Sequence, residues 1–334
     1  MIGSEDSVGV YDLVVRAKQE NLLPSVSVIL PVFNGARFLH ESISSILNQN
    51  SVSLELIIIN DASTDDSEDV IRSFRDSRIR SFLLPTNLGL AATLNFGIQM
   101  SHAPLIARQD QDDISAADRI EKQLAFLHEH SDVALVGTWA TIVKEAADGT
   151  WQEVGMHQHP TRDPELRMRL LWNNPFVHSS VMFRRQSFEK VGQYNVDPVS
   201  GWPEDYDLWS RMMHVGKLGN ISQPLVTYRT TPGGLSDTHS ARIRAGVVRI
   251  SEKNLVTFLA PTVARNQLAG LSRALNGISQ PRVSVIATVK RIRTFHRAVN
   301  SVTASKWTLP RQRLRWTLKL LIRSSTSRKF RFIA

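Results

Sequence analysis

The sequence predicts an α/β protein with a doubly wound, mostly parallel sheet, followed by a basic helical C-terminal region. Three observations lead to this expectation. Short apolar runs alternate with stretches of helical apolar spacing in the first third of the chain, which is typical of βαβ units. The 334 residues are 42% hydrophobic, enough for one large core and an appended segment. The basic residues are concentrated toward the C-terminus.

The first four expected strands are short apolar runs joined by helical segments. "VSVILPVF" (Val26–Phe33) precedes a helix in "ARFLHESISSILNQ", and "LELIII" (Leu54–Ile59) precedes one in "NDASTDDSEDVIRSF". "IRSFLL" is a third strand before the helix "NLGLAATLNFGIQM", and "PLIARQD" a fourth before "ADRIEKQLAFLHEH". Apolar residues recur at helical spacing in the longer segments, whereas the short runs have the length of buried strands.

The alternation is less regular after this point. "VALVGTWATIV" and "FVHSSVMFRR" have the composition of longer strands, "EDYDLWSRMMHVG" predicts a helix with Gly216 just past its end, and "GKLGNISQPLVTYRTTPGGLS" predicts strand and turn. Beyond about Ser236 the chain is helical and basic. We therefore expect an N-terminal extension at 1–24, an α/β domain at 25–236 and a basic helical region at 237–334.

Composition excludes some kinds of site and favours one location. The chain has no Cys, which excludes disulfides and thiolate metal sites. Its first residues carry two acids before any Lys or Arg and no apolar core, so we expect no secretory signal. No stretch reaches the roughly 18 uninterrupted apolar residues of a spanning helix. We expect a cytoplasmic protein, or one bound peripherally to the cytosolic face of a membrane.

The net charge of +9 combines an acidic body with a basic tail. The segment from Lys253 to Ala334 holds 17 of the 40 Lys and Arg residues and no acid, leaving 23 basic against all 31 acidic residues elsewhere. This division predicts an anionic partner. "PRQRLRWTLKLLIRSS" (Pro310–Ser325) suits a helix lying on anionic lipid, and equally a helix packing on the α/β domain. The tail lacks aromatic interleaving and DNA-binding motifs, so we expect no nucleic acid.

Polar side chains follow three of the expected strands. Asn34 follows the first, Asn60 and Asp61 the second, and the acids of Asp110–Asp113 the fourth. Because the carboxyl ends of parallel strands meet at one edge of a sheet, these groups should face one crevice. Carboxylates without cations favour Mg²⁺ or Mn²⁺, which keep one or two protein carboxylates and take further ligands from substrate phosphates.

The acids also have an alternative explanation as a helix start. In "DDISAAD", Ser115 would cap a helix, with Asp118 in a capping box and the other acids favoured by the helix dipole. Capping uses one or two acids, and Asp110 lies at the strand end, outside that role. Asp110 therefore favours the metal–diphosphate hypothesis.

Five segments resemble family 2 glycosyltransferases in order and spacing: "VSVILPVFNGARFLHESISSILNQ", "LELIIINDASTDDS", "NLGLAATLNFGI", "ARQDQDDISAADRIEKQ" and "WPEDYDLWSRM". The resemblance covers about Pro24 to Ser236. It implies a GT-A fold and an inverting glycosyltransferase. It also implies a nucleotide-diphospho-sugar donor, most commonly a UDP-sugar, and Mn²⁺ or Mg²⁺ as cofactor.

The resemblance assigns roles in the donor site. It implies a nucleotide pocket lined by Pro31, Phe33 and Asn34, with Asp61 reading the base. Asn87, with Gly89, matches the N-x-G pattern of the family, although a loop cap with a glycine turn explains these two residues equally well.

The resemblance also assigns the acidic segment. Asp110 and Asp112 form the D-x-D pair, with Asp112 as the direct metal ligand and Asp110 nearer the ribose and the metal. Asp113 resembles an extra acid that often follows the pair, and Arg108 becomes a neighbour of the phosphates.

The catalytic base implied by the resemblance is Asp205 of the Glu204-Asp205 pair. Inversion in one displacement needs a base that takes the acceptor hydroxyl's proton, opposite the leaving diphosphate. Pro203 followed by acids is also an ordinary helix start, where the helix dipole lowers a carboxylate's pKa and a nearby Glu204 charge offsets that effect. His178 is a candidate contact of the acceptor or of the donor phosphates, although strand histidines are more often structural.

"QRLRW" (Gln312–Trp316) has the form of the Q-x-x-R-W signature of processive family members, but it lies far beyond Asp205 and without a spanning helix. We interpret it as a coincidence and expect transfer of a single sugar to a lipid-linked or cell-surface glycan. The alternatives are a non-catalytic nucleotide-sugar-binding or scaffold protein of the same fold and, last, a nucleic-acid binder.

Overall fold

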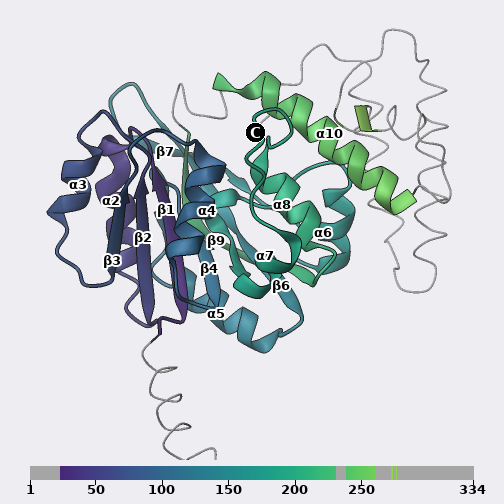
Figure 1. The fold of residues 1–334 in the computed structure, drawn as a ribbon, viewed down its shortest axis with the longest axis horizontal. Coiled ribbons are helices and arrows are strands. Elements are labelled where there is room, and N and C mark those ends of the chain that lie inside the picture. The colour runs from purple at the N-terminus through teal and green to yellow at the C-terminus, as the bar shows by residue number, and fades with distance from the viewer. Residues whose placement is uncertain (1–22, 231–237, 260–271, 274–275, 277–334) are drawn as a thin grey trace, which may run out of the picture.

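A mixed sheet lies at the centre of the protein. The structure, a computed structural model, describes residues 23–230, 238–259, 272–273 and 276. In these residues nine strands form one sheet in the order β3-β2-β1-β4-β8-β6-β9-β5, and β7 pairs with β6. Helices cover both faces of the sheet (Figure 1).

The elements follow the predicted order with few exceptions. The strands are β1 (Val26–Val32), β2 (Leu54–Asn60), β3 (Ile79–Leu83), β4 (Leu105–Arg108), β5 (Ile114–Ser115), β6 (Val133–Glu145), β7 (Trp151–His157), β8 (Met182–Arg184) and β9 (Lys217–Thr230). The helices are α2 (Ala36–Leu47), α3 (Ser67–Ser73), α4 (Leu90–Met100), α5 (Arg119–Glu129), α6 (Asp163–Leu170), α7 (Arg185–Val191), α8 (Glu204–Met212), α10 (Ser240–Leu259) and the 3₁₀ helix η1 (His178–Ser180).

The first half of the sheet is parallel, as the sequence predicts. β1 lies between β2 and β4, with Val26 opposite Leu54 on one side and Leu105 on the other. β3 extends the parallel set beyond β2. The carboxyl ends of β1, β2 and β4 therefore meet at one edge, which is where the three polar clusters were expected.

Both faces of this parallel half are apolar. Ile29 of β1 and Ile57 of β2 face a core shared with α4, α7 and α8. The alternate residues, such as Val28 and Leu56, face a second core formed with α2, α3 and α5. Every residue of β1 and β2 is buried, which explains why these strands read as continuous apolar runs.

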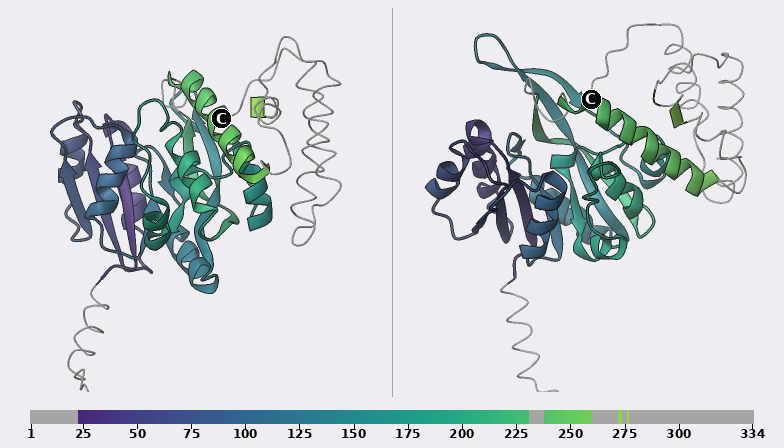
Figure 2. Two further views of the ribbon diagram at one scale, coloured as in Figure 1. Left: turned by 45° about the vertical axis from the view of Figure 1, so that its right-hand side comes forward. Right: turned by 45° about the horizontal axis from the view of Figure 1, so that its top comes forward.

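The second half of the sheet is mixed, so the parallel arrangement does not extend throughout. β8 is antiparallel to both β4 and β6, whereas β6 and β9 are parallel. β6 and β7 form an antiparallel hairpin that projects from the body of the protein (Figure 2).

The prediction of a long strand in "FVHSSVMFRR" is wrong. The segment forms η1 and then only the short strand β8. The Ser180 hydroxyl donates to the carbonyl of Val177 (2.9 Å), and Ser179 donates to the Asp113 carboxylate. Serine side chains that bond to nearby backbone compete with strand pairing, which explains the turn at this position.

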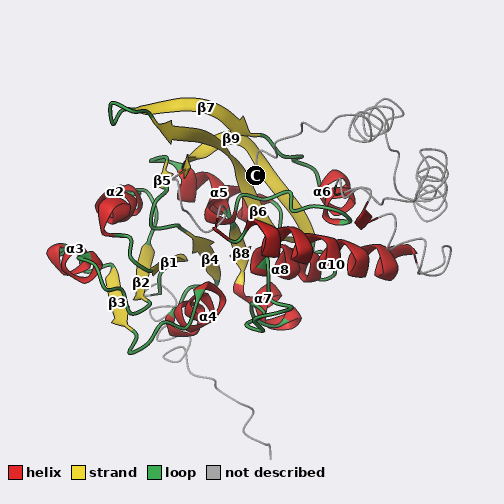
Figure 3. Cartoon of the chain, turned by 90° about the horizontal axis from the view of Figure 1, so that it is seen from above, coloured by secondary structure: helices red, strands yellow, loops and turns green. Residues whose placement is uncertain are grey.

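The basic C-terminal region begins with α10, which lies alongside α8 (Figures 1 and 3). The rest of the predictions for this region, including Pro310–Ser325 and Gln312–Trp316, fall outside the described residues, as does most of the 1–24 extension. In the described part of the chain, no helix is both long enough and apolar enough to cross a membrane.

Candidate active site

The ends of β1 and β2 are joined by side-chain contacts. The Asn34 side-chain carbonyl accepts hydrogen bonds from the backbone N–H (2.8 Å) and the hydroxyl (3.3 Å) of Thr64. The backbone N–H of Asn34 donates to the Ser63 hydroxyl (3.0 Å). Asn34 has φ of 50°, a left-handed conformation that Asn tolerates better than most residues. Asn34 therefore connects the two loops after these strands.

Asp61 holds the loop before α4. Its two carboxylate oxygens accept hydrogen bonds from the backbone N–H groups of Leu88 (2.7 Å) and Gly89 (2.9 Å), and its own carbonyl accepts one from the Asn87 side chain (3.3 Å). Asp61 is only 3% exposed. The N-x-G segment is therefore fixed to the end of β2, which is a structural role, and base reading by Asp61 stays a prediction.

Gln111 connects the acidic loop to the end of β1. Its side chain accepts a hydrogen bond from the Phe33 N–H (2.8 Å) and donates one to the Phe33 carbonyl (3.1 Å). A Cβ on Gly35 would lie 2.4 Å from Gln111 Oε1, so this contact requires glycine there. The Phe33 ring is 47% exposed, while Pro31 is buried inside β1. The exposed aromatic surface at the crevice is therefore that of Phe33.

Helix capping does not explain the acidic segment. Ser115 lies in β5, and its hydroxyl donates to the Gln109 side chain (2.7 Å). Asp118 immediately precedes α5 and makes no side-chain capping hydrogen bond. The capping alternative is therefore wrong at Ser115, because that hydroxyl is taken into the strand-end hydrogen-bond network.

Arg108 and Asp110 form an ion pair at the end of β4. Arg108 Nη2 donates to Asp110 Oδ1 at 2.5 Å, and Arg108 is 2% exposed. The positive charge of Arg108 also lowers the pKa of His178 and favours the charged forms of Glu204 and Asp205. Arg108 thus lies between the acidic loop and the Glu204-Asp205 pair.

The other two acids of the loop differ in their surroundings. Burial, followed by the charge of Asp110, raises the pKa of Asp112 to about 6. Burial and both neighbouring acids raise the pKa of Asp113 well above its usual value. Asp113 accepts hydrogen bonds from Ser179 and from the Arg229 N–H (3.1 Å). Among the described residues, no other residue donates a hydrogen bond to the Asp112 carboxylate.

Arg229 of β9 holds the acidic loop from the opposite strand. Its guanidinium donates to the Asp112 carbonyl (3.3 Å) and pairs with Glu41. It also lies over the rings of Phe38 (5.1 Å) and Trp151 (5.0 Å), which are cation–π distances. These contacts fix the backbone of the loop without occupying the Asp112 side chain.

The acidic loop fits a divalent cation that brings part of its own ligand shell. No group of three or more His, Asp or Glu side chains in the described residues could hold a metal ion alone. Mg²⁺ commonly binds one or two carboxylates and completes its ligands with phosphate oxygens and water. Asp112 has a carboxylate without a protein partner, and burial beside Asp110 makes its negative charge costly, so a cation would stabilise it.

Glu204 and Asp205 open α8 directly after Pro203. Asp205 Oδ2 accepts a hydrogen bond from the Asn174 side chain (2.6 Å), and Oδ1 accepts one from the Tyr206 N–H (2.6 Å). Both donors are neutral. Asn174 is a site residue that the sequence reasoning missed, although it lies in the segment already noted around His178.

Burial determines the acidity of this pair. It raises the pKa of Glu204 to about 8, with the Asp205 charge as the next cause. It also raises the pKa of Asp205 to about 6, against the two hydrogen bonds that lower it, and Asp110 raises it further. We expected the charge of Glu204 to offset the effect of the helix dipole on the pKa of Asp205. Burial and the charge of Asp110 raise this pKa instead. A base with a pKa near 6 is suited to reaction near neutral pH.

His178 lies in η1 behind the acid pair and not on a strand. Its Nδ1 is 3.7 Å from Glu204 Oε1, and its Nε2 is 3.2 Å from the Tyr194 hydroxyl. Burial and the Arg108 charge lower its pKa well below the usual value, so the ring is neutral and the contact with Glu204 is not an ion pair. Contact of His178 with substrate stays a prediction.

The segment leading to Asp205 is held by α10. Arg249 donates to the carbonyls of Ser200 and Trp202, each at 2.9 Å. A Cβ on Gly246 would lie 1.9 Å from the Trp202 carbonyl oxygen, so only glycine permits this approach. α10 therefore braces the chain just before the acid pair.

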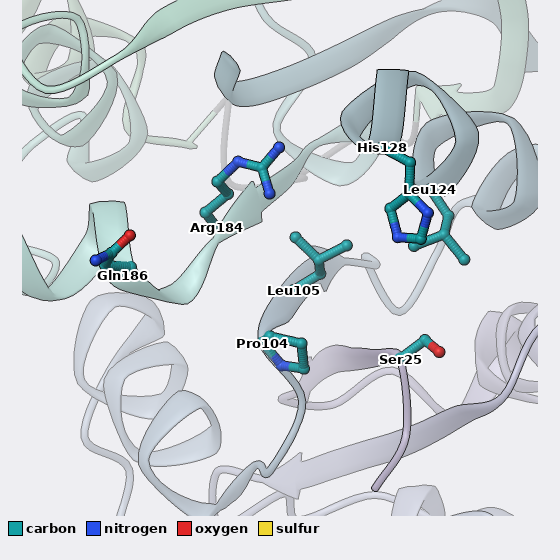
Figure 4. A pocket seen from close by; sticks show the side chains of 7 residues that line it. All are labelled: Ser25, Pro104, Leu105, Leu124, His128, Arg184 and Gln186. Carbon is teal, nitrogen blue, oxygen red and sulfur yellow. The ribbon is translucent and has the colours of Figure 1, made fainter. Parts of the chain in front are cut away.

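A pocket of about 300 Å³ lies elsewhere, at the amino ends of β1 and β4. Figure 4 shows that it is lined by residues such as Ser25, Leu105, His128 and Arg184. Because it lies at the opposite end of these strands from the acidic loop, it is separate from the candidate active site.

The structure brings most of the predicted site residues together. The loops carrying Asn34, Asp61 and Asp110 are joined by direct contacts, and Asp110 acts electrostatically on Glu204 and Asp205. The sequence reasoning missed Gln111, whose position between two predicted ligands was a usable signal. It also missed Arg229, for which a separation of 116 residues from Asp113 left no local signal.

Comparisons of sequence find similarity to glycosyltransferases. The profile described as Glycosyl transferase family 2 matches residues 27–192. The putative glycosyltransferase EpsE of Bacillus subtilis is 34% identical over 211 residues, covering 62% of this chain and 73% of that protein. The UDP-Gal:alpha-D-GlcNAc-diphosphoundecaprenol beta-1,3-galactosyltransferase of Escherichia coli is 32% identical over 211 residues, covering 62% of this chain and 74% of that protein.

Solved structures share the fold. TarS of S. aureus in complex with UDP-GlcNAc has a TM-score of 0.58 at 14% identity, covering 90% of this chain and 89% of that chain. The mannosyltransferase PcManGT of Pyrobaculum calidifontis, in complex with GDP-Man and Mn²⁺, has a TM-score of 0.53 at 16% identity, covering 94% and 93%. The GT-A fold implied by the sequence is thereby confirmed.

Proposed function

The chain belongs to glycosyl transferase family 2, and we propose that it transfers one sugar, with inversion, from a nucleotide-diphospho-sugar to a hydroxyl of a lipid-linked or cell-surface glycan. The observation that carries this proposal is a set of contacts between the two acid clusters. Asp113 of the acidic loop accepts a hydrogen bond from Ser179, and the preceding residue, His178, has its Nδ1 3.7 Å from Glu204 Oε1, so the two clusters lie in one site. A donor diphosphate at the first cluster would then lie near a base at the second.

Asp205 is the proposed base. Its carboxylate takes the proton of the acceptor hydroxyl while that oxygen attacks the anomeric carbon of the donor sugar. The bond between the anomeric carbon and the diphosphate oxygen breaks on the opposite face, and the nucleoside diphosphate leaves with the electron pair. Asn174 and the Tyr206 N–H keep the carboxylate oriented for this proton transfer.

The donor site is proposed at the ends of β1, β2 and β4. Asp112 and Asp110 would hold Mn²⁺ or Mg²⁺, which when bound supplies positive charge to the leaving diphosphate. Arg108 would add a second positive charge there. Phe33 presents an exposed ring for a nucleotide base, and Asn34 and Asp61 shape the pocket around it. The Mn²⁺ and GDP-Man of PcManGT, and the UDP-GlcNAc of TarS, support a nucleotide sugar and a metal.

The acceptor and location are also proposals. The Escherichia coli relative is named for a diphosphoundecaprenol-linked acceptor, which supports a lipid-linked glycan for this chain. We propose that residues 25–236 form the transferase domain and that the basic region at 237–334 binds the anionic cytosolic face of a membrane.

Calorimetric titration tests the donor site. A panel of UDP-, dTDP- and GDP-sugars is titrated with Mn²⁺ and with EDTA into wild type, Asp112→Ala and the control Asp118→Ala. Asp118 belongs to the same segment but is an exposed partner of Lys122. We expect one donor to bind only with metal, and to do so in wild type and Asp118→Ala but not in Asp112→Ala. Binding that is unaffected by EDTA would overturn the metal proposal.

A further inference from the structure

Arg169 of α6 is an arginine without a partner in the described residues. Its guanidinium makes no hydrogen bond or ion pair with them, and its Nε is completely buried. Two positions earlier on the same helix, Arg167 pairs with Asp163 (2.8 Å) and donates to the carbonyls of Met213 and Gly216. In the described part of the chain, the fold therefore provides partners for Arg167 and none for the guanidinium of Arg169.

Arg169 belongs to a cluster of polar side chains from three further segments. The rings of His157 and His159 stack with centroids 5.9 Å apart, and the Tyr228 ring meets His157 edge-on at 5.3 Å. Burial, then the nearby His157 and Arg169, lower the pKa of His159 to about 4. These four residues, here called the Arg169 cluster, offer one positive charge and neutral donors at neutral pH.

No carboxylate of the described residues forms an ion pair with Arg169. The nearby acids of α6 have other partners, since Asp163 pairs with Arg167 and Glu165 with Arg162. The chain after Glu252 has no Asp or Glu, so the C-terminal residues beyond α10 cannot supply an acidic side chain. A guanidinium removed from water without a counter-charge is costly, and an anionic ligand relieves that cost.

The cluster lies close to the proposed base. The carbonyl of Arg169 accepts a hydrogen bond from the Asn173 N–H (2.9 Å), and the next residue, Asn174, binds Asp205. The backbone of Arg169 is therefore joined to Asp205 through the two adjacent residues Asn173 and Asn174.

We propose that the Arg169 cluster binds a phosphate or diphosphate group of the acceptor. This inference rests on the proposed function and deepens it, because it makes the acceptor a glycosyl phosphate or diphosphate. The planar guanidinium suits two phosphate oxygens at once. The ring N–H groups of His157 and His159 add neutral donors. The anchored phosphate would place a sugar hydroxyl at Asp205.

Inorganic pyrophosphate is the probe for the first test. It is titrated calorimetrically, with EDTA present, into full-length wild type, Asp112→Ala, Arg169→Gln and Arg169→Lys. The control Arg162→Gln removes an exposed arginine just before the same helix. We expect binding in wild type, Asp112→Ala and Arg162→Gln, and a loss of about tenfold or more in Arg169→Gln. Arg169→Lys keeps the charge and should restore part of the affinity.

The contrary outcomes are distinct. Pyrophosphate binding that is absent in wild type, or unchanged in Arg169→Gln, overturns the proposal. Binding that requires Mn²⁺ in place of EDTA, and is then lost in Asp112→Ala, would assign the pyrophosphate to the donor site and overturn the proposal as well. If Arg169→Gln does not fold, Arg169→Lys carries the comparison, with a smaller loss expected. If wild type shows no metal-dependent binding of any donor, the proposed function fails instead, since the donor titration does not involve Arg169.

Vesicles distinguish a bound acceptor from a membrane headgroup. Phosphatidylglycerol vesicles supply phosphodiesters without a diphosphate. We expect Arg169→Gln to bind these vesicles as wild type does. A loss of vesicle binding with unchanged pyrophosphate affinity would make the cluster a lipid-surface contact and overturn the acceptor assignment.

Discussion

The two acid clusters of the site are held in opposite ways. The acidic loop after β4 is fixed by two arginines, because Arg108 pairs with Asp110 and Arg229 binds the loop backbone. The Glu204-Asp205 pair is held by neutral donors, the Asn174 amide and the Tyr206 N–H. Both clusters are largely buried, but only the first has a cation in direct contact.

The difference separates two chemical tasks. A cation beside a carboxylate favours its charged form and makes it a weaker base, whereas a neutral hydrogen bond orients it with a smaller loss of basicity. Burial then raises the pKa of Asp205 to about 6. Burial raises the pKa of Asp112 to about 6 as well, but no other described residue donates to its carboxylate, so a bound cation would favour its charged form, whereas neutral donors orient Asp205 to accept a proton.

The largest expected effect comes from exchanging Asp for Asn in each cluster. Asp205→Asn should lower kcat by about 10²–10⁴-fold, the usual contribution of a general base, with donor affinity little changed. Asp112→Asn should instead lose metal-dependent donor binding. Steady-state kinetics and donor calorimetry measure the two effects separately. If Asp205→Asn keeps most of its turnover, the two clusters do not divide binding from proton transfer, and another group must act as the base.

A smaller effect is expected in the pH profile of turnover. Asp205 acts as a base when deprotonated, so kcat should fall below about pH 6. The Asn174 hydrogen bond favours the charged carboxylate, so Asn174→Ala should raise the pKa and move this acidic limb to higher pH. Activity at pH 6.5 would then drop more than at pH 8.5. The control Gln152→Ala removes an exposed side-chain amide on β7, and an equal shift there would remove Asn174 from this role.

Loss of the contacts between α10 and the segment before Glu204 should lower kcat by a few-fold. Arg249→Ala removes both hydrogen bonds to the segment before Glu204, which should lower kcat about three- to tenfold with little change in donor affinity. Arg244 lies on the same helix and, among the described residues, donates only to the carbonyl of Ser240, so Arg244→Ala is a matched control. Equal kinetics for the two variants would show that α10 does not position the acid pair.

The smallest effect is expected in stability. Burial raises the pKa of Glu204 to about 8, so the folded state holds this proton more tightly than the unfolded state. The resulting stabilisation is complete below the ordinary glutamate value and is lost as the pH rises toward 8. Glu204→Gln keeps a neutral side chain at every pH. The Tm of this variant minus that of wild type should therefore increase by a few degrees as the pH rises from 5 to 8. Parallel Tm curves across this range would contradict a protonated Glu204.

Local pattern was enough to predict the parallel half of the fold. Continuous apolar runs identify strands buried on both faces, and the polar residues at their ends, such as Asn34, Asp61 and Asp110, meet because parallel strands end together. The order of these motifs also pointed to the family. Each of these features depends on residues close together in the sequence.

The missed features depend on contacts between distant segments. Arg229 reaches the acidic loop from β9, and the burial that determines the pKa of Asp205 is created by packing of the whole domain. The strand expected around His178 failed because two serines bond locally and to Asp113. No window of sequence contains these partners, so pattern alone could not predict them.

The burial of β1 on both faces separates folding from activity. Inserting one residue near Val26 would exchange the side chains that face the two cores, yet both sets are mainly Val, Ile and Leu. The strand could therefore still be accommodated, while its end would advance by about 3.3 Å. Asn34 would then lose its alignment with Thr64 and Phe33 with Gln111. The register of β1 therefore determines the arrangement of the site at its carboxyl end as well as the packing of the two cores.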